Sequence, residues 1–132
     1  MSDVPATPPP HLFAVRNQRG GPWDWSRPMR EQEAWREHAA FMIALVDDGF
    51  VLLGGPLEDD RDVLLIVTAG SEAAVRDRLA KDPWQRSGML STTAIEGWTI
   101  LLSPEILDSV LLPLAGAAAG TGRAPVPETA ST

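Results

Sequence analysis

The hydrophobic residues between positions 30 and 48 recur at spacings of three and four, the period of an amphipathic helix. Gly49 follows the last of them and is a suitable stop, because glycine enters the left-handed region at little cost. His38 lies on or beside the predicted inward face of this helix. A titratable ring at that position is either a core histidine with satisfied hydrogen bonds or a reagent in catalysis, and the pattern leaves both interpretations open.

Short apolar runs between turn-forming residues predict four strands, within residues 11–17, 50–53, 62–68 and 91–102. The Gly-Gly-Pro sequence at 54–56 is expected to break the second strand. Ser71 is a suitable N-cap for a second helix over 71–81, which Pro83 is expected to end. The resulting β-α-β-β-α-β order predicts an α+β, ferredoxin-like domain with a four-stranded antiparallel sheet.

Residues 1–10 and 113–132 are rich in small residues and proline, so both segments are predicted to be disordered. The ferredoxin-like domain is then expected at 11–102, followed by a short additional helix at 103–112 that begins with Ser-Pro-Glu.

Residues 63–67 and 100–102 are apolar at every position, whereas a strand with one wet face should alternate. Two helices of this length cover only one face of a four-stranded sheet. A second copy of the sheet is the simplest cover for the other face, so the sequence predicts a homodimer.

The formal charge of -7 and the absence of clustered basic residues argue against nucleic acid as a partner. The chain has no cysteine, which excludes disulfides, thiolate metal sites and thiol nucleophiles. No apolar run approaches the about 20 residues of a membrane span. The N-terminal residues also lack the basic start and apolar core of a signal peptide. No membrane association is expected, and a cytoplasmic location is the default prediction.

The loop at residues 18–29 places Asp24 between Trp23 and Trp25. An acid between two rings that lost its water would have a raised pKa and would suit general acid catalysis. A solvated loop acid beside tryptophans that pack on the protein is the more ordinary interpretation. Trp84 and Trp98 are candidates for the same pocket, with a core role the alternative for Trp98. Five tryptophans and no tyrosine suggest an apolar, aromatic ligand.

The acidic residues 58–62 lack the spacing and glycine of a calcium loop, and a solvated connection is the favoured interpretation. His11 and His38 are the only histidines, too few for an ordinary zinc site, so no metal is predicted. Gly54-Gly55-Pro56 is neither a dinucleotide fingerprint nor a phosphate loop. Its glycines permit a close approach of the backbone to a ligand. The remaining substrate-binding candidates are Met42, Gly55 and Pro56, and no cofactor is predicted.

Two segments, EHAAFMIALVDDGFVLLGGPL and KDPWQRSGML, give the chain a resemblance to the YCII-related domains of the dimeric α/β-barrel superfamily, over residues 11–102. The resemblance implies a ferredoxin-like monomer whose sheet pairs with another. It also implies a pocket between sheet and helices and a catalytic pair, here His38 and Asp82, that works without a metal. The chain departs from the pattern in its longer, tryptophan-rich loop GGPWDWSRP and in the helix after Ser103.

These observations favour a small cofactor-independent enzyme of isomerase or lyase type, acting on a largely apolar small molecule. His38 would transfer the proton, and Asp82 would orient its ring. The competing hypothesis is a non-catalytic small-molecule-binding or accessory protein of the same fold. Without the resemblance, a core-edge His38 and an Asp82 that only caps the turn at Pro83 would be the favoured interpretation.

Overall fold

The computed structural model describes residues 11–107. The segments 1–10 and 113–132, predicted to be disordered, and residues 108–112 of the predicted last helix lie outside the described residues. In chain order the elements are β1 (His11–Arg19), η1 (Met29–Glu31), α1 (Trp35–Asp47), β2 (Val51–Pro56), β3 (Asp62–Ala69), α2 (Glu72–Leu79), α3 (Pro83–Ser87), β4 (Leu90–Gly97) and η2 (Glu105–Leu107).

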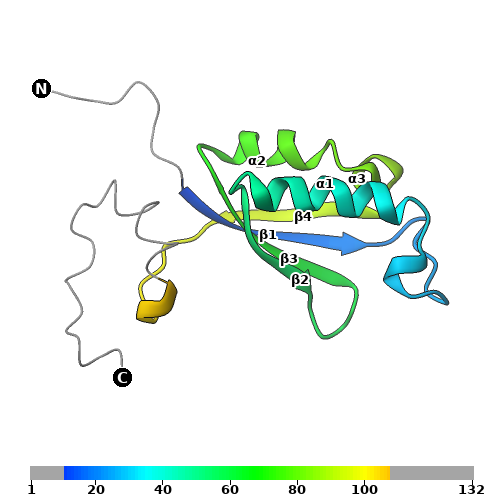
Figure 1. Ribbon diagram of the computed structural model, residues 1–132, viewed down its shortest axis with the longest axis horizontal. Coiled ribbons are helices and arrows are strands. Elements are labelled where there is room, and N and C mark those ends of the chain that lie inside the picture. The colour runs from blue at the N-terminus through cyan, green and yellow to red at the C-terminus, as the bar shows by residue number, and fades with distance from the viewer. Residues whose placement is uncertain (1–10, 108–132) are drawn as a thin grey trace, which may run out of the picture.

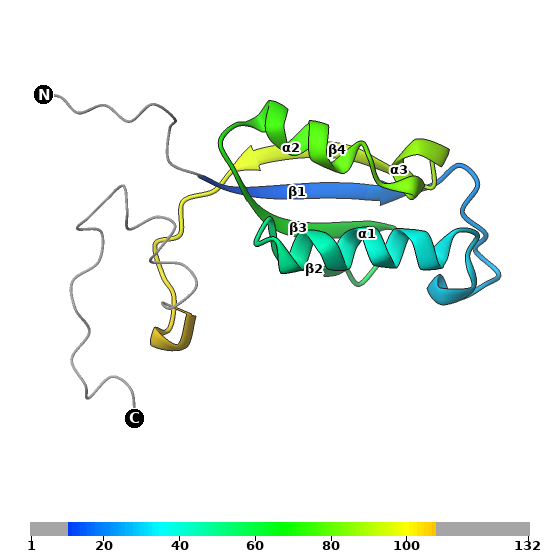
Figure 2. The ribbon, with the colours of Figure 1, turned by 45° about the horizontal axis from the view of Figure 1, so that its top comes forward.

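The four strands form one antiparallel sheet in the order β2-β3-β1-β4. The helices α1, α2 and α3 lie on one side of this sheet (Figures 1 and 2). The predicted α+β, ferredoxin-like arrangement is therefore confirmed. Within the described residues, no helix is long and apolar enough to cross a membrane.

Two hydrophobic cores lie between the sheet and its helices. The larger core joins the inward faces of the sheet, α1 and α2; its buried members are Phe13, Val15, Leu45, Phe50, Val51, Leu65, Val67, Val75 and Leu79. The smaller core, called the tryptophan cluster below, buries Trp23, Trp84, Met89 and Leu90, with Met29, Ala34, Trp35 and Val63 packed against them. The tryptophan cluster lies where α3 meets the loop before α1 and the start of α1. Its aromatic rings surround His38.

The sheet differs from the sequence prediction at Gly-Gly-Pro. These residues do not break the second strand but form the second half of β2. A Cβ at Gly54 would lie 2.5 Å from Leu65 Cδ2, so the glycine lets a core leucine of the next strand lie against the backbone. Pro56 is tolerated because β2 is an edge strand of the sheet.

The last strand is shorter than the predicted 91–102, because β4 ends at Gly97. Trp98 still donates its backbone N–H to Leu12 O at 2.9 Å. The strand pairing with β1 ends at Gly97, opposite Phe13. The segment leads away from the sheet (Figure 1) with Leu101 83% and Leu102 91% exposed. Residues 100–102 therefore give no support to a sheet covered on both faces.

The helix boundaries also differ from those predicted from the sequence. The first helix begins at Trp35 and not near residue 30, because Ala34 adopts a left-handed conformation (φ 62°) immediately before it. Ser71 caps α2 as predicted, accepting a hydrogen bond from Ala74 N at 3.1 Å. Pro83 does not simply end this helix, which already finishes at Leu79, but occupies the first turn of α3.

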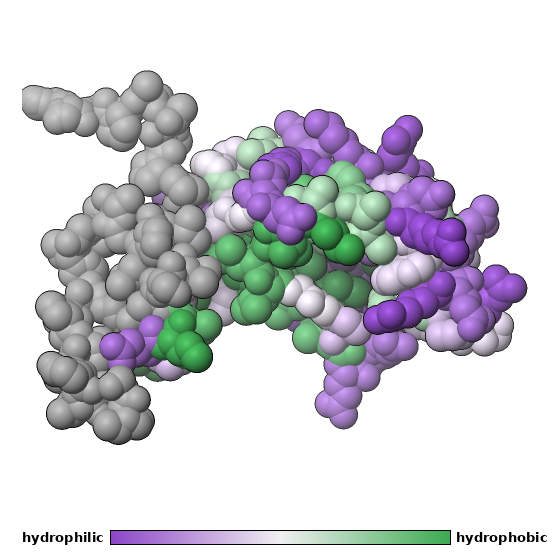
Figure 3. Space-filling model, viewed as in Figure 1, coloured by the Kyte–Doolittle hydropathy of each residue, from purple (hydrophilic) through white to green (hydrophobic). Residues whose placement is uncertain are grey.

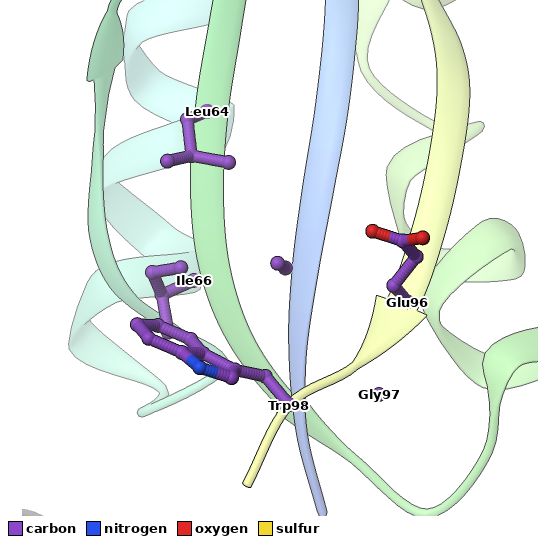
Figure 4. A pocket seen from close by; sticks show the side chains of 6 residues that line it. Leu64, Ile66, Glu96, Gly97 and Trp98 are labelled. Carbon is purple, nitrogen blue, oxygen red and sulfur yellow. The ribbon is translucent and has the colours of Figure 1, made fainter. Parts of the chain in front are cut away.

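The sheet face opposite the helices presents Ala14, Leu64 and Ile66 beside Trp98. With Glu96 and Gly97, these side chains line a hollow of about 320 Å³ (Figure 4). Figure 4 shows the Trp98 ring lying alongside Ile66, with the Glu96 carboxylate on the β4 side. No helix of the described chain lies on this open face of the sheet, and its hollow is mainly apolar. Figure 3 shows further apolar surface at the place of η2, where Ile106 is 80% exposed.

Gly21 should be required for the junction between α3 and the loop at residues 20–28, called the tryptophan loop below. Its φ is +53°, and a Cβ there would lie 2.9 Å from Gly88 O, whereas nothing lies within 4 Å of a Cβ at Gly20. We expect Gly21→Ala to lower the free energy of unfolding by about 2 kcal/mol or more. Gly20→Ala should change it by less than about 0.5 kcal/mol. Denaturant unfolding of both variants tests this, and equal effects would contradict it.

Candidate active site at His38 and Asp82

His38 lies on the inward face of α1, as its position in the helical pattern predicts. It lies one turn into α1, and its backbone N–H donates to Ala34 O at 3.0 Å. The side chain is 11% exposed, so the ring is nearly but not fully enclosed.

Asp82 is the N-cap of α3, and its side chain is 2% exposed. Both of its carboxylate oxygens lie 2.9 Å from His38 Nδ1. One of them, Oδ1, also accepts the backbone N–H of Trp84 at 2.9 Å, which is the capping hydrogen bond. The fold therefore brings the two residues into direct contact, and Asp82 caps the turn at Pro83 as well.

This contact assigns the proton on the imidazole. A carboxylate only accepts hydrogen bonds, so His38 Nδ1 is the donor, and the neutral ring has its lone pair on Nε2. Within residues 11–107 His38 Nε2 makes no hydrogen bond, and the only fully buried side-chain nitrogen or oxygen without a partner there is Arg19 Nε. His38 Nε2 therefore reaches the accessible surface. A histidine oriented through one nitrogen and open at the other is suited to proton transfer.

Aromatic rings surround the imidazole. The Trp84 ring is stacked on it, with 3.8 Å between ring centroids and 9° between planes. The half-buried Trp35, three residues before His38 on α1, has its ring centroid 5.9 Å from the imidazole. Trp84 was a predicted site residue, whereas Trp35 was placed only in the helix pattern. Its i, i+3 spacing from His38 is the signal that could have identified it.

The tryptophan loop packs on the site through Trp23. This ring is 6% exposed and meets Trp84 edge to face, with 5.1 Å between centroids. The Arg19 guanidinium lies over the Trp23 ring, 4.3 Å from its centroid. Trp25 is 54% exposed and has its centroid 6.1 Å from that of Trp23. Sequence reasoning did not find Arg19, because an arginine at a strand end has no distinctive pattern.

Gln32 fixes the shape of this loop. Its side chain accepts the backbone N–H of Asp24 at 2.9 Å and donates to Asp24 O at 2.7 Å and to Arg27 O at 3.0 Å. It is 4% exposed, so these three hydrogen bonds satisfy a buried amide. No sequence signal points to Gln32 either.

Asp24 does not have the raised pKa of a desolvated acid. Its side chain is 50% exposed. Hydrogen bonds from the hydroxyl and backbone N–H of Ser26 lower its pKa, and Arg27 contributes in the same direction. Its exposure and its lowered pKa fit the interpretation of Asp24 as a solvated loop acid.

The other predicted site residues lie in different places. Met42 packs against the larger core. Gly55 and Pro56 lie in the edge strand β2, where they pair with Leu64 and Val63. Trp98 lines the hollow on the open face of the sheet, so it does not share a pocket with Trp84, which is buried on the helix side. Binding roles for Met42, Gly55 and Pro56 remain predictions.

The acidic residues before β3 make hydrogen bonds and ion pairs within the fold. Asp60 accepts from Arg19 Nη1 at 2.7 Å and Asp62 from Arg16 Nη1 at 2.8 Å. Asp59 accepts the backbone N–H groups of Arg61 and Asp62, which lowers its pKa. In the part of the chain that the structure describes, no three histidine or acidic side chains are grouped to hold a metal ion.

No protein-family model and no curated protein matches the chain. Among solved structures, it is similar to the 5-chloro-2-hydroxyhydroquinone dehydrochlorinase of Burkholderia phenoliruptrix, determined in complex with 2,5-dihydroxybenzoquinone. The two chains are 24% identical, and the match covers 67% of this chain and 93% of that chain with a TM-score of 0.47. At this level the likeness defines neither the family nor the reaction of this chain.

Asp82 should contribute to stability in two separable ways. Asp82→Ala removes the cap of α3 and leaves the buried Nδ1 of His38 unpaired, so we expect a loss of about 2–4 kcal/mol in the free energy of unfolding. Asp82→Asn keeps an oxygen for the Trp84 N–H and should lose clearly less. Ser71→Ala measures a cap alone, at about 1 kcal/mol. If Asp82→Ala costs no more than Ser71→Ala, the His38 contact adds nothing to stability.

Proposed function

We propose that the protein is a small cofactor-independent enzyme of isomerase or lyase type, in which His38 transfers a proton and Asp82 orients its ring. The observation that supports this proposal most directly is the pair of 2.9 Å contacts from His38 Nδ1 to the Asp82 carboxylate. These contacts leave Nε2 as the atom available to a substrate. The buried Asp82 needs no reorganisation when the ring becomes charged.

The proton can be followed through the reaction. Nε2 of the neutral ring takes a proton from an acidic C–H or O–H group of the substrate, and the resulting imidazolium is stabilised by Asp82 through Nδ1–H. In an isomerisation, Nε2–H returns the proton to a different atom of the substrate. In an elimination, loss of the proton is coupled to departure of a leaving group, and the proton leaves Nε2 afterwards. Both routes return His38 to its starting form without a metal or an electron carrier.

The surroundings of His38 favour a largely apolar substrate. Trp35 is half-buried 5.9 Å from the imidazole, and Trp84 covers one face of the ring. Aromatic side chains offer flat apolar area with a polar edge, which suits conjugated organic molecules. The cytoplasmic location expected from the sequence remains a prediction.

A non-catalytic binding protein is the second candidate, and the hollow on the open face of the sheet favours it. That hollow, of about 320 Å³, is lined by Leu64, Ile66 and Trp98 and contains no pair of groups suited to proton transfer. A ligand held there would be recovered unchanged.

Proton transfer can be tested before the substrate is known, because an enzyme of this type exchanges substrate hydrogen with solvent. We expect the wild-type protein in D₂O to catalyse deuterium incorporation into members of a panel of conjugated carbonyl compounds and phenols, followed by proton NMR. His38→Gln should slow this exchange at least about 100-fold. His11→Gln, the matched control at the other histidine, should retain it.

A His38→Gln variant that exchanges as fast as wild type would contradict catalysis by His38, whereas bound but unexchanged compounds would favour the binding protein. Thermal unfolding of the variant must accompany the assay. A large loss of stability with exchange retained would make His38 a structural residue.

We also propose that a second copy of the chain covers the open face of the sheet, in the manner of the YCII-related domains that the sequence resembles. Ala14, Leu64 and Ile66 form apolar area on this face, with Glu96 and Arg16 on the neighbouring strand positions. Opposite charges on one face permit a self-complementary contact around a two-fold axis.

Leu64→Glu should separate the two copies, because it would place an additional carboxylate in the apolar interface. We expect the mass measured by light scattering to fall from that of a dimer to that of a monomer. Ile43→Glu, which changes an apolar residue 59% exposed on α1, is the matched control and should remain dimeric. A wild-type protein that is monomeric at all accessible concentrations would refute the homodimer.

A further inference from the structure

Trp84 contacts both members of the His38–Asp82 pair. Its ring is stacked on the imidazole at 3.8 Å, and its backbone N–H donates to Asp82 Oδ1 at 2.9 Å. The side chain is 1% exposed and is among the largest fully buried side chains of the described residues. Trp84 therefore does more than fill the core, because its indole contacts the imidazole and its backbone N–H binds the carboxylate.

The indole itself cannot tilt freely. Its Nε1–H donates to Glu33 O at 2.7 Å, and Trp23 meets it edge to face, with 83° between the planes. The left-handed Ala34 follows Glu33 directly, at the turn where the chain enters α1. A strained residue beside a functional site is often maintained by the contacts around it, and the Nε1–H bond to Glu33 is such a contact here.

Asp82 and Trp84 restrain the imidazole in different ways. The contacts to Asp82 fix the position of Nδ1 and select the nitrogen that carries the proton, but they allow the ring to swing about the line from Nδ1 to the carboxylate. The parallel indole face, 9° from the imidazole plane, blocks that swing. Together the two restraints determine the direction of the Nε2 lone pair.

We propose that Trp84 is a positioning residue of the site: it fixes the plane of the His38 ring and thereby aims Nε2 at the substrate. This inference rests on the proposed function of His38. It makes the segment Asp82-Pro83-Trp84 a single unit in which the first residue orients Nδ1 and the third orients the ring. Pro83 sets the spacing between them by starting α3.

The test uses nitrogen and proton NMR of protein labelled with ¹⁵N-histidine, in which His11→Gln leaves His38 as the only histidine signal. We expect wild-type His38 to show one neutral tautomer with a slowly exchanging Nδ1–H. In Trp84→Leu the Nδ1–H should exchange with water about tenfold faster, and the ¹⁵N shifts should move towards a mixture of tautomers. In Trp84→Phe a ring is kept without the bond to Glu33, so the tautomer should persist while exchange rises severalfold.

Trp23→Leu is the matched control. Trp23 is also buried in the tryptophan cluster and contacts Trp84, but it makes no ring contact with His38 among the described residues. Its substitution should lower the melting temperature as Trp84→Leu does but change the His38 signals much less, because the bond from Trp84 Nε1–H to Glu33 O still holds the indole. Equal loss of the Nδ1–H signal in both leucine variants would reduce Trp84 to a core residue and overturn the proposal.

If Trp84→Leu does not fold, Trp84→Phe still tests the proposal. An Nδ1–H exchange rate in Trp84→Phe equal to that of wild type would also overturn it. No substrate is needed for these measurements. A wild-type protein without the Nδ1–H tautomer would contradict the proposed function itself. A wild-type tautomer that survives unchanged in both Trp84 variants would contradict only the positioning role.

Discussion

The hydrogen bond between His38 Nδ1 and Asp82 is the interaction on which the helix side of this protein depends. It joins the first turns of α1 to the cap of α3, and both groups are almost fully buried. Either group alone would leave a buried polar atom unpaired, at a cost of about 1–3 kcal/mol. The pair therefore fixes how α3 approaches α1, and with it the place of Trp84. The tryptophan cluster and the loop that Gln32 holds together are built around this junction.

The two faces of the sheet have different chemistry. On the helix side, β1 presents Phe13 and Val15 to the larger core and then two buried polar residues, Asn17 and Arg19, towards the tryptophan cluster. Asn17 accepts from Thr92 Oγ1 at 2.7 Å and from Gln85 Nε2 at 3.2 Å, which ties α3 to β4. On the open face, Arg16 and Gln18 donate to Asp62 at 2.8 and 3.3 Å, and the hollow itself is lined mainly by apolar side chains. The buried directional contacts described above therefore lie where the proposed chemistry takes place.

Much of this fold follows from local sequence signals. The helical period around His38 and the cap at Ser71 predict α1 and α2, because both depend on residues within a few positions of each other. The sequence-based predictions are wrong where an element boundary depends on residues that are distant in the sequence. Gly54 continues a strand because Leu65 lies against it, and β4 ends at Gly97 although residues 100–102 are also apolar. Pro83 is compatible with ending one helix or starting the next, and the side chain of Asp82 decides for the second. The His38–Asp82 contact spans 44 positions, so the resemblance to a family, and no spacing rule, suggested it.

The two interpretations of His38 that the sequence leaves open are compatible with each other. Nδ1 is the satisfied atom of a core histidine, whereas Nε2 has no partner among the described residues and reaches the surface. The cap formed by Asp82 likewise assists a chemical role. A carboxylate already held by the Trp84 N–H and the start of α3 does not have to move when the imidazole gains charge. The hydrogen bond at Nδ1 therefore directs the reactive Nε2 on the other side of the ring. The contacts that stabilise the fold are the ones that would prepare the site.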